Sequence, residues 1–101
     1  MWAAIAEQLR RGETVEVRSS GDSMVPIVRS RQLVRLEPIG EGPVDVGMVV
    51  LAKVHGRFYL HKVVGVRGDR VQIGNNRGFI NGWTSRDRVY GVATSVDGRP
   101  I

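Results

Sequence analysis

The first twelve residues have the hydrophobic pattern of an amphipathic helix. Apolar side chains recur at intervals of three and four residues, at Trp2, Ile5, Ala6 and Leu9, with polar side chains between them. This spacing places the apolar side chains on one face of a helix, and Gly12 is a residue type that commonly ends helices. A helix this short is unstable alone in water, so we expect it to pack against the rest of the domain.

From residue 14 onward, the pattern changes to short Val-rich runs separated by Gly, Asn and Asp, which is typical of strands and tight turns. We predict strands at 14–18, 33–37, 47–54, 58–66, 70–74 and 88–95. The short connections 54–57 and 67–69 contain Gly, so the central strands are expected to form an antiparallel meander. The predicted fold is therefore mostly β: one small antiparallel, partly rolled, barrel-like domain (14–101) with one short N-terminal helix (1–12).

The segment 74–83, GNNRGFINGW, interrupts the strand pattern with three Gly and three Asn, and we expect an ordered irregular loop there. Its amides are Asn75, Asn76 and Asn81, and its large apolar side chains are Phe79, Ile80 and Trp83. In one interpretation the amides bond to backbone groups and the apolar side chains fill the end of the barrel. In the other, the exposed amides and the Trp83 edge line a groove for an extended peptide or a nucleotide. Apolar groups beside a free strand edge would favour the peptide.

Composition is that of one globular domain, with 101 residues, 42% hydrophobic and 25% charged. The absence of Cys excludes thiol nucleophiles, thiolate zinc sites and iron–sulfur clusters, and it fits a reducing compartment, so we expect a cytoplasmic protein. The longest apolar run, 48–52, is far shorter than the roughly 20 residues of a membrane-spanning helix. We therefore expect neither membrane association nor a secretion signal.

The chain carries 15 basic and 10 acidic residues, a formal net charge of +5, which keeps nucleic acid or an acidic partner open. However, the basic residues are scattered, and no recognition helix or aromatic stacking pair accompanies them. A protein or peptide is thus the favoured partner. His55 and His61 lack the spacing of metal ligands, so neither a metal site nor a cofactor is predicted.

The sequence GDSMVP (21–26) contains the first candidate for chemistry, Ser23. In this loop Gly21 permits a close approach of the backbone, Met24 can anchor the loop when buried, and Pro26 fixes its exit. A serine hydroxyl attacks a carbonyl carbon only when a base lies within hydrogen-bonding distance. A nearby base is therefore required.

His61 and Lys62 are the candidate bases, adjacent on one predicted strand. Side chains alternate along a strand, so only one of them can face Ser23. Burial favours the neutral form of either side chain, at lower cost for His than for Lys. Periodicity leaves open which one faces Ser23, and it equally allows both to be polar residues at the rim of the sheet.

These motifs resemble those of a serine-peptidase clan that contains LexA-type repressor domains and type I signal peptidases. GDSMVP resembles the nucleophile motif G-x-S-M-x-P, and HKVVGVRGDRV (61–71) resembles the second motif, K-R-V-I-G-x-x-G-D-x-V in bacterial signal peptidases. The resemblance covers about residues 20–75. It implies that Ser23 is the nucleophile and that His61 is the general base, as in the eukaryotic and archaeal enzymes, with Lys62 at the Arg that follows the base.

The chain also departs from this clan. IGNNRG (73–78) is similar to the segment T-K-G-D-x-N, but Asn75 stands where the clan has Asp, which leaves Asp69 and Asp87 as candidates to orient the base. Arg31 and Gln32 replace the usual Gly-Asp. With 22 residues before Ser23 we expect no DNA-binding domain or membrane anchor, and without an Ala-Gly dipeptide we expect no LexA-type self-cleavage.

Two main hypotheses follow. The first is a serine peptidase that hydrolyses amides or esters with Ser23 and His61, or Lys62 as the alternative base, and with a backbone N–H in 21–24 as oxyanion donor. The second is a non-catalytic protein-interaction module, since the chain resembles small phage and bacterial proteins of this clan that end in G-N-N-x-G-x-x-N-G-W. Weak nucleic-acid binding is a further alternative, and the pairing of clan members through their C-terminal strands leaves a homodimer through 88–101 open.

Overall fold

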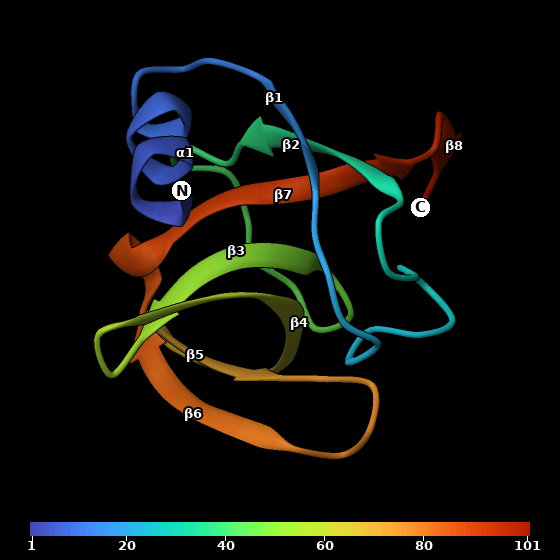
Figure 1. Cartoon of the computed structure of the whole chain (residues 1–101). Coiled ribbons are helices and arrows are strands. Elements are labelled where there is room, and N and C mark those ends of the chain that lie inside the picture. Colours follow the sequence, from blue (N-terminus) through green and yellow to red (C-terminus); the bar gives the residue numbers. More distant parts are fainter.

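The computed structural model describes residues 1–101 and consists of one α-helix, eight strands and one short 3-10 helix (Figure 1). The helices are α1 (Trp2–Arg10) and η1 (Arg86–Arg88). The strands are β1 (Val15–Arg18), β2 (Leu33–Pro38), β3 (Val49–Val54), β4 (Arg57–Arg67), β5 (Arg70–Gly74), β6 (Ile80–Ser85), β7 (Val89–Val96) and β8 (Arg99–Pro100). The predicted fold class, a small antiparallel β domain with one N-terminal helix, is confirmed. No helix is both long and apolar enough to cross a membrane.

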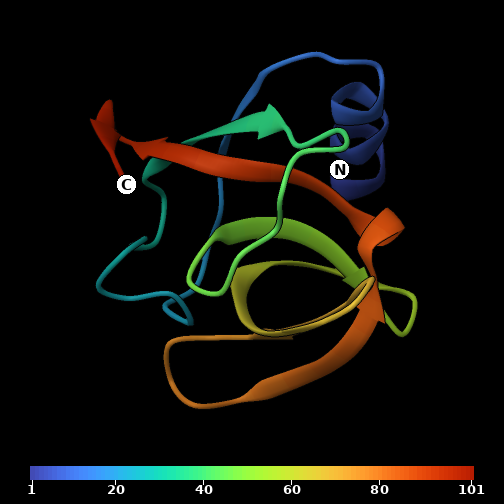
Figure 2. The ribbon, with the colours of Figure 1, turned by 180° about the vertical axis from the view of Figure 1, so that it is seen from behind.

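The strands form a single antiparallel sheet in the order β1-β2-β7-β3-β4-β5-β6, with β8 paired to the end of β7. Seen from both sides, the half of the sheet from β3 to β6 curls strongly (Figures 1 and 2). This curl brings β6 back to β3, where the Thr84 hydroxyl donates to the Lys53 carbonyl at 2.8 Å. The sheet is thus partly rolled but not closed.

The predicted turns between the central strands are present. His55 and Gly56 connect β3 to β4 with φ angles of 48° and 81°, the pair of positive values that a tight hairpin turn requires. β4 and β5 are connected through Gly68, and β4 pairs with both β3 and β5. The antiparallel meander is therefore confirmed.

Two strands were not predicted from the sequence. The segment expected to be an irregular loop over 74–83 is a loop only between β5 and β6, because its second half pairs with β5 as β6. Phe79 and Ile80 are 62% and 47% exposed, so the interpretation that they fill the end of a barrel is wrong. The other missed strand, β8, follows a tight turn in which Asp97 and Gly98 have positive φ angles.

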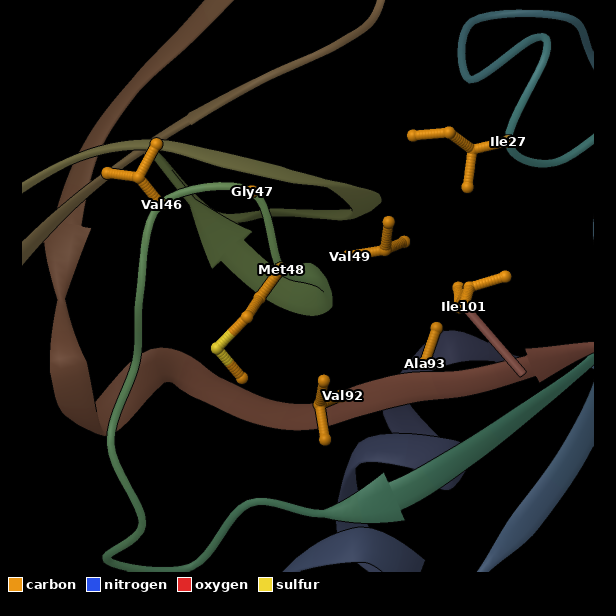
Figure 3. Close-up of a pocket in the computed structure, with 8 residues that line it drawn as sticks. All are labelled: Ile27, Val46, Gly47, Met48, Val49, Val92, Ala93 and Ile101. Carbon is orange, nitrogen blue, oxygen red and sulfur yellow. The ribbon is translucent and has the colours of Figure 1, made fainter.

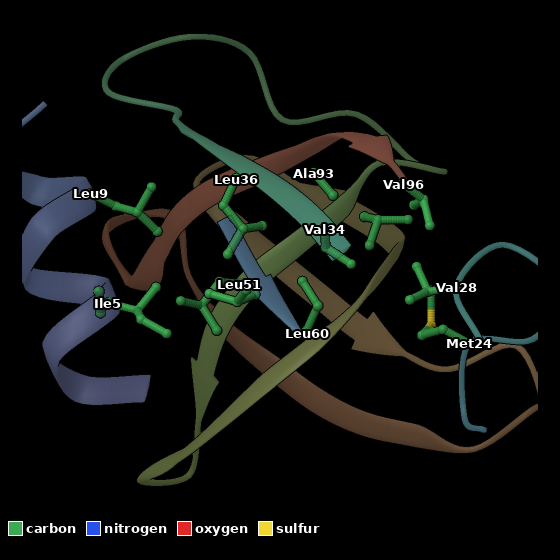
Figure 4. Close-up of a cluster of buried hydrophobic side chains, with 13 residues drawn as sticks. Ile5, Leu9, Met24, Val28, Val34, Leu36, Leu51, Leu60, Ala93 and Val96 are labelled. Atoms are coloured by element: carbon green, nitrogen blue, oxygen red, sulfur yellow. The ribbon is translucent and has the colours of Figure 1, made fainter. Parts of the chain in front are cut away.

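The hydrophobic core consists of two clusters. The larger one joins the apolar face of α1 to the sheet and also takes in Met24 and Val28 from the β1–β2 connection (Figure 4). The helix packs closely because Gly91 of β7 has no side chain: a Cβ there would lie 2.8 Å from a methyl group of Leu9. The smaller cluster lies within the curled half of the sheet, among β3, β4, β5 and the start of β7.

Candidate functional site

The loop between β1 and β2 holds Ser23 in a fixed position. Met24 and Val28 are each 4% exposed and anchor the loop in the larger core cluster, as the sequence suggested for Met24. The backbone N–H of Val28 donates to the Met24 carbonyl at 3.0 Å. Gly21 has a φ of 98°, and its N–H donates to the Ser30 hydroxyl at 3.3 Å across the loop. Pro26 follows with a cis peptide bond.

His61 lies on β4 and faces Ser23. The distance between the Ser23 Oγ and the His61 Nε2 is 3.1 Å, within hydrogen-bonding range. Tyr59, two residues earlier on the same strand, has its ring 5.2 Å from the His61 ring, as alternation along a strand predicts. Lys62 belongs to the opposite set of side chains, and no hydrogen bond joins it to Ser23. Of the two predicted bases, the structure brings only His61 to the serine.

Asn81 lies on the other side of the His61 ring. Its Oδ1 is 2.7 Å from the His61 Nδ1. An amide oxygen can only accept a hydrogen bond, so this contact suits the tautomer in which Nδ1 carries the ring proton. In that tautomer Nε2 can accept the Ser23 hydroxyl proton. Ser23, His61 and Asn81 therefore form a continuous row of hydrogen-bonding contacts.

A β-bulge places Asn81 at this position. In the pairing of β5 with β6, Ile73 is opposite Gly82 and Gly74 is opposite Ile80, so Asn81 is an extra residue without a partner. Bulges redirect a side chain relative to the regular alternation of a strand. From the sequence, Asn81 is predicted only as a loop amide, because no regular pattern in the sequence marks a bulge.

Asp69 and Asp87, the two candidates to orient the base, do not contact it, and neither does Asn75, which stands where the resembled clan has Asp. The Asn75 side chain instead accepts the backbone N–H groups of Arg77 and Phe79, at 2.8 and 3.0 Å. Asp69 is exposed and its backbone carbonyl accepts the Arg86 N–H, while Asp87 is exposed in η1. The side chain that does contact the His61 Nδ1 is that of Asn81.

The β5–β6 loop also fastens the loop that carries the serine. The Asn76 backbone N–H donates to the Ser23 carbonyl at 2.9 Å, and the Asn76 side chain donates to the Met24 carbonyl at 3.3 Å. The exposed side chains of Arg77 and Asp22 also form an ion pair, with 2.7 Å between the Arg77 Nη2 and the Asp22 Oδ2. Trp83, the last residue of the predicted loop, lies apart from this contact, with the Arg67 guanidinium over its ring at 5.6 Å.

Backbone N–H groups near the serine are free to donate. Those of Ser23 and Met24 donate to no acceptor in the protein, whereas the N–H of Gly21 donates to Ser30 and that of Val25 to Asp22. Unpaired N–H groups at a nucleophile are the kind of donor that stabilises an oxyanion. The free N–H groups of Ser23 and Met24 thus lie within 21–24, the segment that was predicted from the sequence to supply an oxyanion donor.

A small cavity of about 90 Å³ opens at Ser23 and His61. Its walls are formed by Trp2 of α1, Leu60 of β4 and residues of the loop between β1 and β2 (19–32), which we call the serine loop. A larger cavity of about 620 Å³ lies elsewhere, at the start of β3 and along β7 (Figure 3). It is lined by Ile27, Val46, Gly47, Met48, Val49, Val92, Ala93 and Ile101, none of which can transfer a proton or attack a carbonyl. The candidate nucleophile and the candidate base therefore lie at the smaller cavity, not at the larger one.

No group of three or more His, Asp or Glu side chains lies close enough together to hold a metal ion. No family model, curated protein or solved structure matches this chain.

Proposed function

We propose that the protein is a serine hydrolase that cleaves peptide amide or ester bonds through Ser23, His61 and Asn81. The observation that supports this most strongly is the 3.1 Å contact between the Ser23 Oγ and an imidazole nitrogen whose opposite nitrogen is held by Asn81. A nucleophile, a base and a group that orients the base are the recurring parts of serine and cysteine hydrolases on unrelated folds. The peptidase motifs in the sequence point to the same two residues, Ser23 and His61.

In the proposed reaction, the Ser23 Oγ attacks the carbonyl carbon of the substrate while its proton moves to the His61 Nε2. The negative charge on the carbonyl oxygen is stabilised by the free N–H groups of Ser23 and Met24. The intermediate collapses when the carbon–nitrogen or carbon–oxygen bond of the leaving group breaks, and the leaving group takes the proton from His61. Water then attacks the acyl-serine with His61 as base, which releases the acid and restores Ser23.

A fluorophosphonate tests this proposal without a known substrate. It reacts with activated serines by forming an Oγ–phosphorus bond as the phosphorus–fluorine bond breaks, and intact-mass spectrometry with peptide mapping locates the adduct. We expect labelling at Ser23 that is absent in Ser23→Ala and slowed at least about a hundredfold in His61→Ala. Two matched controls should be labelled normally. Ser95→Ala removes a hydroxyl that lies on β7, and Lys62→Met changes the residue next to the base. Normal labelling of His61→Ala would refute the proposal.

A second candidate function, binding to a protein partner, is supported by the exposure of Phe79 and Ile80. These apolar side chains lie at the start of β6, the terminal strand of the sheet, where an extended peptide can add by strand pairing. Peptides selected by display on the Ser23→Ala protein should lose binding in Phe79→Ser and retain it in Val66→Ser, which changes an exposed apolar residue of β4. Equal binding to both variants would exclude this surface.

A further inference from the structure

A second cavity adjoins the one at Ser23. Its volume is about 300 Å³, and its charged lining residues are Arg18 at the end of β1 and Arg31 just before β2. Trp2, Ser19 and Ser20 line both this cavity and the cavity at Ser23. A substrate bound at Ser23 can therefore extend into the second cavity, which we call the arginine cavity.

The positive charge of the arginine cavity is not neutralised by the protein. Every ion pair in the structure uses Arg11, Arg35 or Arg77, and no acidic side chain lines either cavity. Arg18 donates through Nη1 to the Arg31 carbonyl at 2.8 Å, which leaves most of its N–H donors free. The Arg31 guanidinium and the hydroxyls of Ser19 and Ser20 donate to no acceptor in the protein.

The backbone of Arg31 adopts a conformation that favours glycine. Its φ is 69°, in the left-handed region, where a residue with a long side chain is strained. The Arg31 N–H donates to the Ser19 carbonyl at 2.7 Å, so the end of the serine loop is fixed against its beginning. This contact brings both arginines to one cavity. Strained residues of this kind occur preferentially at binding and catalytic sites.

We propose that the arginine cavity binds a carboxylate of the peptide that Ser23 cleaves. The planar fork of a guanidinium matches the two oxygens of a carboxylate, and two guanidinium groups without an acidic partner, beside free hydroxyls, supply several charge-assisted hydrogen bonds. The carboxylate belongs either to an Asp or Glu side chain near the cleaved bond or to the C-terminus of the peptide. This inference rests on the proposed function for the cleavage step, and it assigns to that function an acidic peptide substrate.

The test is a binding experiment on the inactive Ser23→Ala protein, labelled with ¹⁵N and followed by NMR. The probes are acetyl-pentaalanine amide with one Glu placed at each position in turn, the same series with Gln, and pentaalanine with a free or amidated C-terminus. We expect one Glu position, or the free C-terminus, to increase affinity about tenfold over its neutral counterpart. The shifted signals should be the Trp2 indole N–H and the amides of Ser19 and Ser20.

Arg18→Gln and Arg31→Gln should each remove this advantage, whereas Arg57→Gln, which removes one exposed charge at the start of β4, should preserve it. If the gain in affinity for the acidic peptide disappeared equally in Arg57→Gln, the proposal would be overturned, because the gain would then reflect the overall charge of the protein. Acidic and neutral peptides that bind alike would overturn it as well. Tighter binding of oligothymidine with the same dependence on Arg18 and Arg31 would assign the cavity to nucleic-acid phosphate instead.

The proposed function and this inference fail separately. If fluorophosphonate labels Ser23 but no carboxylate increases affinity, the acidic specificity is wrong and the hydrolase proposal stands. If acidic peptides bind through the arginines but Ser23 is never labelled, the cavity is an acidic-peptide site in a protein without this catalytic activity.

Discussion

Among single residues, Asn81 has the most indirect role in the proposed hydrolysis, because it would act only through His61. Asn81 does not line the cavity at Ser23, but its Oδ1 lies 2.7 Å from the His61 Nδ1. In Asn81→Ala the imidazole loses this partner and can rotate or change tautomer. We expect kcat for a cleavable ester to fall about tenfold to a hundredfold, with KM unchanged, in steady-state kinetics.

Asn81→Asp distinguishes this positioning role from a structural one. A carboxylate accepts the same Nδ1 proton and also stabilises the imidazolium that forms during the reaction. We expect this variant to retain kcat within about threefold of the original protein or to exceed it, measured with the same ester. If Asn81→Asp were as slow as Asn81→Ala while circular dichroism showed an intact fold, the positioning role would be wrong.

At Arg31, strain in the backbone lowers the stability of the fold, whereas the side chain is proposed to bind a substrate carboxylate. With φ at 69°, glycine at this position avoids the contact between Cβ and the backbone that strains other residues. We expect Arg31→Gly to have a free energy of unfolding about 1 kcal/mol above that of Arg31→Ala in urea denaturation. Both variants should lose the preference for acidic peptides. Equal stability of the two variants would show that the backbone here is relaxed.

Of the proposed catalytic residues, Ser23 and a choice of two bases were predictable from local sequence, whereas Asn81 as the partner of the base was not. Ser23 stands among turn-forming residues, and alternation along the strand restricts the base to either His61 or Lys62. Which of the two faces the serine depends on how the β1–β2 loop lies over the sheet, a tertiary contact that periodicity does not contain. Asn81 reaches His61 only because the bulge gives β6 one extra residue, and in the sequence Asn81 is only one of three loop amides, with Asn75 and Asn76.

At the scale of elements, α1 is attached through Leu9, which is 2% exposed and lies against Gly91. Leu9→Ala leaves a cavity between the helix and β7, and we expect it to lower the free energy of unfolding by about 2–5 kcal/mol in urea denaturation. Gln8→Ala, at the neighbouring half-buried position, should change it by no more than about 0.5 kcal/mol. A small effect of Leu9→Ala would mean that the helix contributes little to the fold.

The missed strand β6 shows what the hydrophobic pattern could not predict. Its sequence, INGWTS, lacks the alternation of a half-buried strand, and its second and third residues, Asn81 and Gly82, are typical of turns. Gly82 has a φ of 135° and lies so close to the His55 ring that a Cβ would be 3.0 Å from its Nε2. The strand forms because β5 offers a pairing edge and because the curl of the sheet brings it against β3, and both are non-local causes.

In the whole molecule, the two core clusters are linked by β3. Alternate residues of this strand belong to different clusters: Val49 and Leu51 to the larger one, Val50 and Ala52 to the smaller one. All four are buried, so β3 cannot leave one cluster without leaving the other. The serine loop is anchored in the larger cluster, whereas Asn81 comes from β6, which pairs beside the smaller one. The candidate site is therefore assembled only when both clusters are formed.

This coupling predicts a single cooperative unfolding transition. The two tryptophans report on opposite parts of the molecule, Trp2 on α1 and Trp83 on β6, so each of Trp2→Phe and Trp83→Phe leaves a reporter for one part. In both variants the urea midpoint from fluorescence should coincide with the midpoint from far-ultraviolet circular dichroism. If the Trp83 signal changed at a urea concentration lower by about 0.5 M or more than the dichroism, β6 would unfold separately. Asn81 would then leave His61 while most of the sheet was still folded, and fluorophosphonate labelling would be lost before the global transition.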